Sequence, residues 1–169
     1  MYTLEDYKEK VRKAEEITDT ITDDFYNDCP DPKTIKLTLG DEVAKIAKLD
    51  AKYKMMRNKV SRQHDKACKL HATVSLMARE YYMKSRAFDP DEYQSYGFKL
   101  PFRPEVTPHA TQLQSWLDAD EIYQTVTQYK AVTRTNLDLI NENIKALIER
   151  GRQLKTAQEF IKFNRGETD

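Results

Sequence analysis

From Asp41 to Asp89 the chain contains neither proline nor glycine, and this long uninterrupted run limits the fold more than any other feature. Apolar residues recur through the run at three-, four- and seven-residue spacings, as they do along one face of an α-helix. A helix that began with Asp41 as its N-cap and continued to residue 86 would be about 69 Å long. Such a helix cannot bury an apolar face alone, so we expect it to pack on a partner helix or on another subunit. The residues of this face are Val43, Ile46, Leu49, Tyr53, Met56, Val60, Ala67, Val74, Ala78 and Tyr81.

Two further helices flank this run. The first is expected from Leu4 to about Thr20, followed by a loop where acidic residues, Asn27 and two prolines break the apolar pattern. The last is expected to start between Pro108 and Asp118 and to end near Phe163. A third of the residues are charged and only four are glycine, which favours long helices over a sheet. The sequence therefore predicts an all-α fold, an elongated long-helix hairpin or a bundle subunit, forming a single structural unit.

Residues 87–112 are expected to be irregular, because five prolines and glycines are spread through them. An irregular segment of this length within a compact domain is usually functional or partner-binding. It contains four aromatic residues that either stack on nucleic-acid bases or anchor the loop onto its own helices. These are Tyr93, Tyr96, Phe98 and Phe102.

The formal net charge is zero, but the charges are segregated along the chain. Residues 41–86 hold twelve Lys and Arg against five Asp and Glu, whereas both flanking segments are net acidic. Such a distribution is typical of a phosphate-binding surface. It also fits a well-solvated helix with surplus lysine.

The end of the basic run brings cations and aromatic rings within a few helical turns. Single-stranded nucleic acid is bound by this combination, since cations neutralise phosphates and rings stack on unpaired bases. The alternative is that the tyrosines are core or interface residues and the cations are solvated. The candidate binding residues are Lys66, Lys69, Arg79, Tyr81, Tyr82, Lys84 and Arg86.

An apolar heptad seam runs along the last expected helix. It serves either as an intrachain packing surface or as a contact between subunits, with Gly151 marking a bend or a close helix approach. The candidate oligomerisation residues are Leu137, Ile140, Ile144, Leu147, Leu154 and Ile161.

Sequence motifs of enzymes are missing: there is no Walker-type phosphate loop, dinucleotide fingerprint or nucleophile elbow. We therefore expect no enzymatic activity and no cofactor. His64, Cys68 and His71 share a helical face, and their side chains are of the types that bind zinc. They fit equally well as a small buried thiol with two histidines at the polar edge of a packed helix face. No metal is therefore expected. With no apolar run of membrane-spanning length, no signal-peptide pattern and two cysteines expected to be reduced, a cytoplasmic location is predicted.

Three short motifs resemble the UvsY family of recombination mediators from T-even-type phages. The family's Leu-Lys-Ala-Arg-Leu-Asp-Tyr motif is matched by Leu76, Ala78, Arg79 and Tyr82, with the trailing Arg86 in register. Residues 4–6 resemble the family's N-terminus, and residues 117–163 its last helix, with matches at Ala146, Arg150, Gly151, Lys155 and Phe163. The likeness covers most of residues 41–86 and 113–163 and is weak between them.

The resemblance implies a cytoplasmic protein, in the host if phage-encoded, that binds single-stranded DNA and helps a RecA-like recombinase displace a single-strand-binding protein. It also implies a ring-forming homo-oligomer, a hexamer or heptamer, in which residues 1–112 bind DNA and residues 113–169 oligomerise. Arg79 matches a residue implicated in strand binding, whereas Met77 replaces the motif lysine. The alternative is a phage structural or assembly adaptor whose basic rod contacts protein.

Overall fold

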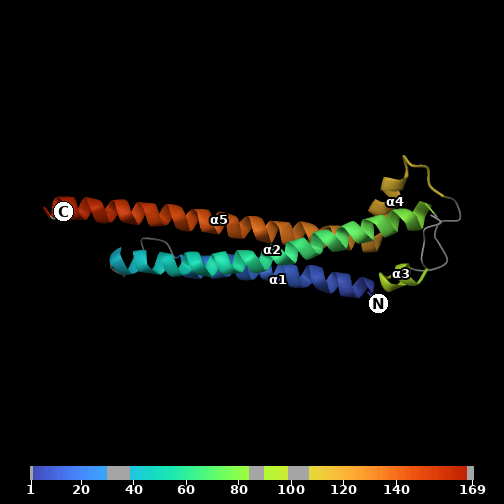
Figure 1. The fold of residues 1–169 in the computed structure, drawn as a ribbon, viewed down its shortest axis with the longest axis horizontal. Coiled ribbons are helices and arrows are strands. Elements are labelled where there is room, and N and C mark those ends of the chain that lie inside the picture. Colours follow the sequence, from blue (N-terminus) through green and yellow to red (C-terminus); the bar gives the residue numbers. More distant parts are fainter. Residues whose placement is uncertain (1, 30–38, 84–89, 99–106, 167–169) are drawn as a thin grey trace. The chain divides into compact units, whose positions relative to one another are not determined.

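The computed structural model describes residues 2–29, 39–83, 90–98 and 107–166, and these residues are almost entirely helical (Figure 1). No strand occurs in these ranges, so the predicted all-α class is confirmed. None of the helices described is long and apolar enough to cross a membrane. In chain order the helices are α1 (Leu4–Asp28), α2 (Leu39–Met83), α3 (Pro90–Ser95), α4 (Leu113–Ala119) and α5 (Glu121–Asn164).

Helix α1 continues eight residues beyond its expected end, so the loop expected after Thr20 was placed too early. Thr3 caps its start, because the Asp6 amide donates to Thr3 Oγ1 at 3.2 Å while the Thr3 amide donates to Asp6 Oδ2 at 2.7 Å. At the other end, Asp28 lies 2.6 Å from Lys52 Nζ and accepts a hydrogen bond from the Tyr53 hydroxyl at 3.1 Å. The acidic residues therefore extend α1 by pairing with α2 instead of ending it.

Helix α2 is the long helix that the sequence predicts, although it begins at Leu39, so Asp41 lies in its first turn and is not its N-cap. Most of the expected apolar face is buried, while Val43, Ile46 and Met56 are half-buried. The buried members are Leu49, Tyr53, Val60, Ala67, Val74, Ala78 and Tyr81.

The expected last helix is divided at Asp120, where the backbone is extended with φ −80° and ψ 118°. Asp120 Oδ1 accepts a hydrogen bond from the Tyr123 amide at 2.8 Å, as an N-cap does for the first turn of α5. The prediction of one continuous helix was wrong here, because Asp120 caps α5 and separates it from the short helix α4.

The chain forms two compact units, and α1, α2 and α5 each contribute one part to each unit. Unit 1 contains residues 1–18 and 62–135, and unit 2 contains residues 19–61 and 136–169. The division at residue 112 that the sequence suggested, between a DNA-binding and an oligomerising part, stays a prediction.

The core of unit 1 is aromatic and includes the segment that follows α2. Tyr93 of α3 is 1% exposed, and its hydroxyl donates to Glu80 Oε2 at 2.7 Å. The Tyr7 hydroxyl donates to the carbonyl oxygen of Tyr96 at 3.1 Å, and α3 lies beside the N-terminal end of α1 (Figure 1). The described aromatic residues of the segment therefore anchor it onto its own helices, while Phe102 lies outside the described residues. The buried cluster comprises Tyr7, Val74, Met77, Ala78, Tyr81, Tyr82, Tyr93, Phe98, Leu117 and Val126.

Unit 2 has a smaller core, in which Leu49 and Tyr53 of α2 pack with Leu147 of α5. Phe25 of α1 adds an edge-to-face contact with Tyr53, with ring centroids 5.8 Å apart. At its margin, Arg150 pairs with the buried carboxylate of Glu42 at 3.2 Å. Together these contacts hold parts of three helices side by side.

Candidate nucleic-acid interface

Three cations form a line on the exposed face of α2 within unit 1. Arg62, Lys66 and Lys69 are spaced by four and three residues, so they share one side of the helix. All three are exposed, and none makes an ion pair or side-chain hydrogen bond with another described residue. We call them the basic strip; their unpaired charges are free to neutralise phosphates.

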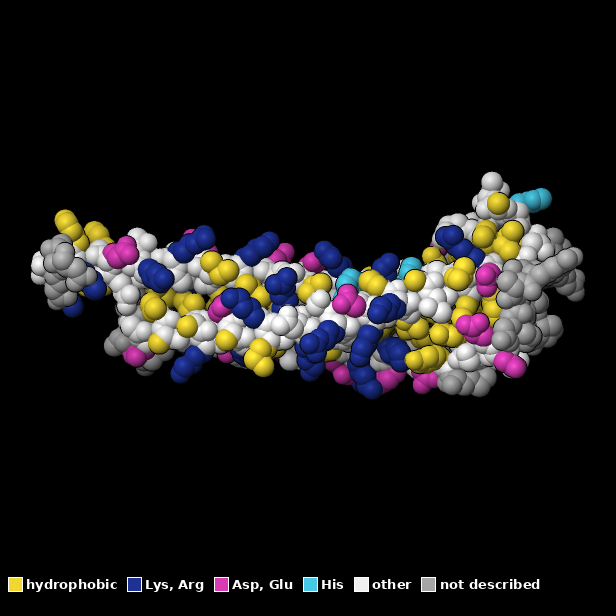
Figure 2. Space-filling model, in the orientation of Figure 1, with side chains coloured by type: hydrophobic (Ala, Val, Ile, Leu, Met, Phe, Trp, Pro, Cys, Tyr) yellow, Lys and Arg dark blue, Asp and Glu magenta, His cyan; other side chains and the backbone are white. Residues whose placement is uncertain are grey.

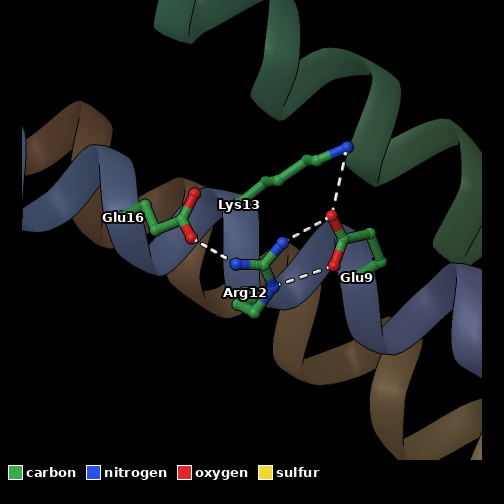
Figure 3. Close-up of polar contacts among 4 residues, drawn as sticks. All are labelled: Glu9, Arg12, Lys13 and Glu16. Atoms are coloured by element: carbon green, nitrogen blue, oxygen red, sulfur yellow. Dashed lines mark hydrogen bonds and ion pairs between the residues drawn. The ribbon is translucent and has the colours of Figure 1, made fainter.

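The cations of α1 are in a different state, as Figure 3 shows. Arg12 donates to both carboxylate oxygens of Glu9, at 2.8 and 2.7 Å, and to Glu16 at 2.6 Å. Lys13 lies 3.2 Å from Glu9. The hydrogen bond from Arg12, followed by that from Lys13, lowers the pKa of Glu9 to about 2. These α1 cations are already neutralised locally, unlike those of the basic strip.

Arg79 is also exposed and has no ion pair with another described residue. It follows Lys69 by ten residues, which turns it roughly a fifth of a revolution away from Lys69 and further from Lys66. Two other candidate cations, Lys84 and Arg86, lie outside the described residues. Arg79 is therefore the only matched motif cation that the described part of the chain places.

The two candidate tyrosines are part of the unit 1 core. Tyr81 is 5% exposed and its ring centroid lies 5.3 Å from that of Phe98. Tyr82 is 9% exposed, packs edge-on against Trp116 and donates its hydroxyl to Asp120 Oδ2 at 2.8 Å. Burial, followed by the hydrogen bond to Asp120, raises the pKa of Tyr82. In this conformation neither ring face is available to stack on a base.

Met77, which replaces the motif lysine, is buried in the same cluster and is 5% exposed. This position therefore does not face solvent, and a DNA contact from it is not compatible with this packing. The exposed apolar residues of the segment are instead Leu76 at 59% and Met83 at 41%. Neither was a candidate from the sequence. Their seven-residue spacing, on a different side of the helix from the expected buried face, could have indicated a pair of exposed apolar residues.

On the face drawn in Figure 2, basic side chains alternate with acidic and apolar ones. A line of single cations suits a flexible strand, since it contacts successive phosphates without reading base edges. Such contacts give binding that is weak and strongly dependent on salt.

His64, Cys68 and His71 do not converge as a ligand set. His64 Nδ1 lies 3.1 Å from Thr133 Oγ1, and its Nε2 lies 3.4 Å from Cys68 Sγ. The His71 ring instead contacts the ring of Tyr123, with centroids 5.9 Å apart. Among the residues described, no group of three His, Cys, Asp or Glu is arranged to hold a metal ion.

The predicted oligomerisation seam divides into a buried and an accessible part. Ile140 and Leu147 are 0% and 1% exposed, so they lie in the interior of the chain's own fold. Leu137, Ile144 and Leu154 are half-buried, and Ile161 is 41% exposed. Beyond the seam, α5 presents two strongly exposed rings, Phe160 and Phe163.

Comparison with known proteins gives one family. A family model described as recombination, repair and ssDNA binding protein UvsY matches residues 8–167, which is nearly the whole chain. Comparisons with curated proteins and with solved structures returned no match.

Proposed function

Since the chain belongs to the UvsY family of recombination, repair and single-stranded-DNA-binding proteins, we propose that it binds single-stranded DNA through the basic strip of α2. The observation that supports this choice is the pairing state of the cations. Arg62, Lys66 and Lys69 are exposed and unpaired among the described residues, whereas Arg12 and Lys13 of α1 are bound to glutamates. Arg79 extends the contact, and Lys84 and Arg86 remain candidates from the sequence.

We further propose that the protein acts as a mediator, helping a RecA-like recombinase replace a single-strand-binding protein on DNA. It does so by binding and not by catalysis, with nucleotide hydrolysis left to the recombinase. A strand held along several subunits would present spaced bases and phosphates to the recombinase. The family membership supports the recombination role, and the exposed strip supports the binding step.

Oligomerisation would make this weak binding effective. Three or four cations per subunit give a modest affinity, but several copies on one strand raise the effective concentration of each further contact. We propose a ring of six or seven subunits, in which the exposed C-terminal part of α5 supplies apolar contact surface. Ile161, Phe160 and Phe163 are the accessible apolar residues there.

The test is titration of a labelled oligonucleotide at several salt concentrations with two double variants. Lys66→Ala with Lys69→Ala should weaken binding and flatten the log-log salt slope by about 1.4 for each subunit that contacts the strand, or about 0.7 for each phosphate that is no longer neutralised. The matched control is Arg12→Ala with Lys13→Ala, which changes the net charge equally but removes cations that are already paired.

The proposal requires the two variants to differ. If both lower the affinity equally, the effect is one of overall charge and the strip is not the site. If the wild type shows no salt-dependent binding, the DNA-binding function itself is excluded and a protein-binding adaptor takes its place.

A further inference from the structure

We propose that Tyr2 and Lys10 form a base-stacking site for single-stranded DNA at the N-terminal end of α1. The Tyr2 ring stacks on one unpaired base, and Lys10 binds a phosphate beside that base. The inference rests on the proposed function, because it adds a contact with bases to a strand whose phosphates are held by the basic strip.

Tyr2 is the strongly exposed aromatic ring of unit 1 among the described residues, with 39% of its surface accessible. The tyrosines that the sequence suggested for stacking, Tyr81 and Tyr82, are buried. The other strongly exposed rings of the described residues all belong to unit 2 and are Tyr26, Phe160 and Phe163. Since the basic strip belongs to unit 1, Tyr2 is the exposed ring that shares a unit with it.

Contacts with its neighbours hold the Tyr2 ring in place. It stacks on the buried ring of Tyr7, with centroids 5.5 Å apart and an angle of 24° between the planes. The ring of Tyr96 lies at 5.9 Å, and the Tyr2 amide donates to the carbonyl oxygen of Ser95 at 2.6 Å. A ring that is already positioned binds a ligand with less ordering cost than a mobile one.

Lys10 supplies a cation next to this ring. Its Nζ lies 4.9 Å from the centroid of the Tyr2 ring, and it makes no ion pair with another described residue. Asp6, one turn earlier on α1, accepts hydrogen bonds from the Thr3 amide at 2.7 Å and from the Thr3 hydroxyl at 2.8 Å. Because a lysine side chain is long and flexible, Lys10 can leave the ring to a base and move its ammonium group to the adjoining phosphate.

The site is joined to the side of α2 that carries the basic strip. Glu80 follows Arg62 by about five helical turns, so the two residues lie on the same side of the helix. Glu80 accepts the hydrogen bond from Tyr93, and residues 95 and 96 of the same segment contact Tyr2. Figure 2 shows hydrophobic side chains next to basic ones near the N-terminal end of α1. A strand bound along the strip can therefore continue toward the Tyr2 ring.

The chemistry of the two side chains selects the base and phosphate of an unpaired nucleotide. Every base has a flat face that stacks on an aromatic ring, and every base in a strand is accompanied by a phosphate. The basic strip contacts phosphates alone, so it binds a strand with bases and a strand without them alike. The Tyr2 site makes the binding depend on bases without a preference for sequence.

The test compares a labelled oligonucleotide with an abasic strand of the same length, which keeps the phosphates and lacks the bases. The full-length protein should bind the strand with bases more tightly. Tyr2→Leu should lower that affinity about fivefold or more, and should leave unchanged the affinity for the abasic strand and the salt slopes of both. Tyr2→Phe keeps the ring and should bind like the wild type. Tyr26→Leu, which removes a 74% exposed ring from unit 2, is the matched control and should change neither affinity.

Lys10→Gln tests the role of the cation separately from that of the ring. It should weaken the binding of both strands and flatten their log-log salt slopes by about 0.7 for each subunit that contacts the strand, because one phosphate is no longer neutralised. Unchanged salt slopes would show that Lys10 does not bind a phosphate and would overturn its part in the site.

Three results would overturn the stacking site. One is equal affinity of the wild type for the two strands, a comparison that needs no variant and so does not depend on how a variant folds. The second is an equal loss on both strands in Tyr2→Leu, and the third is an equal effect of Tyr26→Leu. Failure of the proposed function is separately visible, because the wild type would then bind neither strand. A wild type that binds both strands equally and with salt dependence refutes the stacking site alone.

Discussion

At the scale of single residues, hydrogen bonds from tyrosine hydroxyls connect the elements of unit 1. Tyr82 donates to Asp120, Tyr93 to Glu80, and Tyr7 to the carbonyl of residue 96, while all three rings are buried. Burial is the largest cause that raises the pKa of each of these phenols, and for Tyr82 and Tyr93 the bonded carboxylate adds to it. The neutral phenol is thus favoured in the folded state.

This arrangement predicts a loss of stability at alkaline pH. A phenol whose pKa is raised on folding contributes fully below its unfolded pKa of about 10 and loses that contribution as the pH rises above it. Tyr93→Phe should cost about 1 kcal/mol at about pH 8 but should make the decline in unfolding free energy shallower between about pH 9.5 and about pH 11. Urea unfolding measures both. Tyr26→Phe, at a 74% exposed ring, is the control, and an equally shallow decline there would contradict the explanation.

A second prediction concerns the position where the motif lysine is missing. Met77→Lys would place an ammonium group in the aromatic cluster without a partner, and should destabilise unit 1 by several kcal/mol with no gain in oligonucleotide affinity. Leu76→Lys, one residue earlier at an exposed position, should change stability by no more than about 0.5 kcal/mol. Thermal unfolding of the two variants distinguishes the positions. Tighter, more salt-dependent binding by a stable Met77→Lys protein would show that this side chain faces the DNA.

The periodicity of the sequence predicted only some of the α2 residues in the buried cluster of unit 1. Val74, Ala78 and Tyr81 follow the helical face of α2 and were expected to be buried. Met77 and Tyr82 lie on either side of that face, and they are buried because residues beyond α2 cover them. The members of the cluster beyond α2 come from α1, from residues 93–98, from α4 and from α5, and no periodicity in α2 could indicate their positions.

At the scale of helices, the sequence predicted the middle of each helix better than the residues at which it begins and ends. The acidic residues before Cys29 suggested a loop, but Asp24 and Asp28 both pair with Lys52, at 3.1 and 2.6 Å, and the helix continues. Asp120 was expected near the start of a single helix, whereas its side chain bonds both Tyr82 and the first turn of α5. In both places a contact between distant residues decides where the helix ends.

Helix α5 offers a third prediction, at Gly151. A Cβ there would lie 3.5 Å from Ile46 Cγ2, which is an ordinary contact distance, so the close approach of α2 tolerates alanine. Gly151→Ala should therefore raise the unfolding free energy by about 0.5–1 kcal/mol through helix propensity. Gly97→Ala is the contrasting variant, since Gly97 has φ +91° and a Cβ would lie 3.0 Å from the Tyr2 carbonyl oxygen. It should destabilise the protein, and a rise in stability there would contradict the conformation of this turn.

At the scale of the whole molecule, the basic strip and the most exposed phenylalanines lie on different helices. The unpaired cations of the basic strip belong to α2, while the most exposed phenylalanines belong to the C-terminal end of α5. The sequence predicted both features by segment: the basic run by counting charges, and the apolar α5 by its heptad seam. It could not predict which residues of the seam would be buried within the chain itself, because that depends on the packing of Leu147 against Leu49 and Tyr53.

Self-association tests how α5 is used. If its exposed end joins subunits, Phe160→Ser with Phe163→Ser should lower the mass measured by light scattering toward the 19.8 kDa monomer, while circular dichroism stays helical. Met55→Ser, which removes an exposed apolar side chain from α2, should leave the mass unchanged. Ile140→Asp should instead unfold unit 2, because it buries an unpaired carboxylate at a fully buried position. If the Phe160 and Phe163 double variant stays folded and fully associated, the contact between subunits lies outside this end of α5. If the Ile140→Asp protein is folded but monomeric, the contact lies at the part of the apolar seam that contains Ile140.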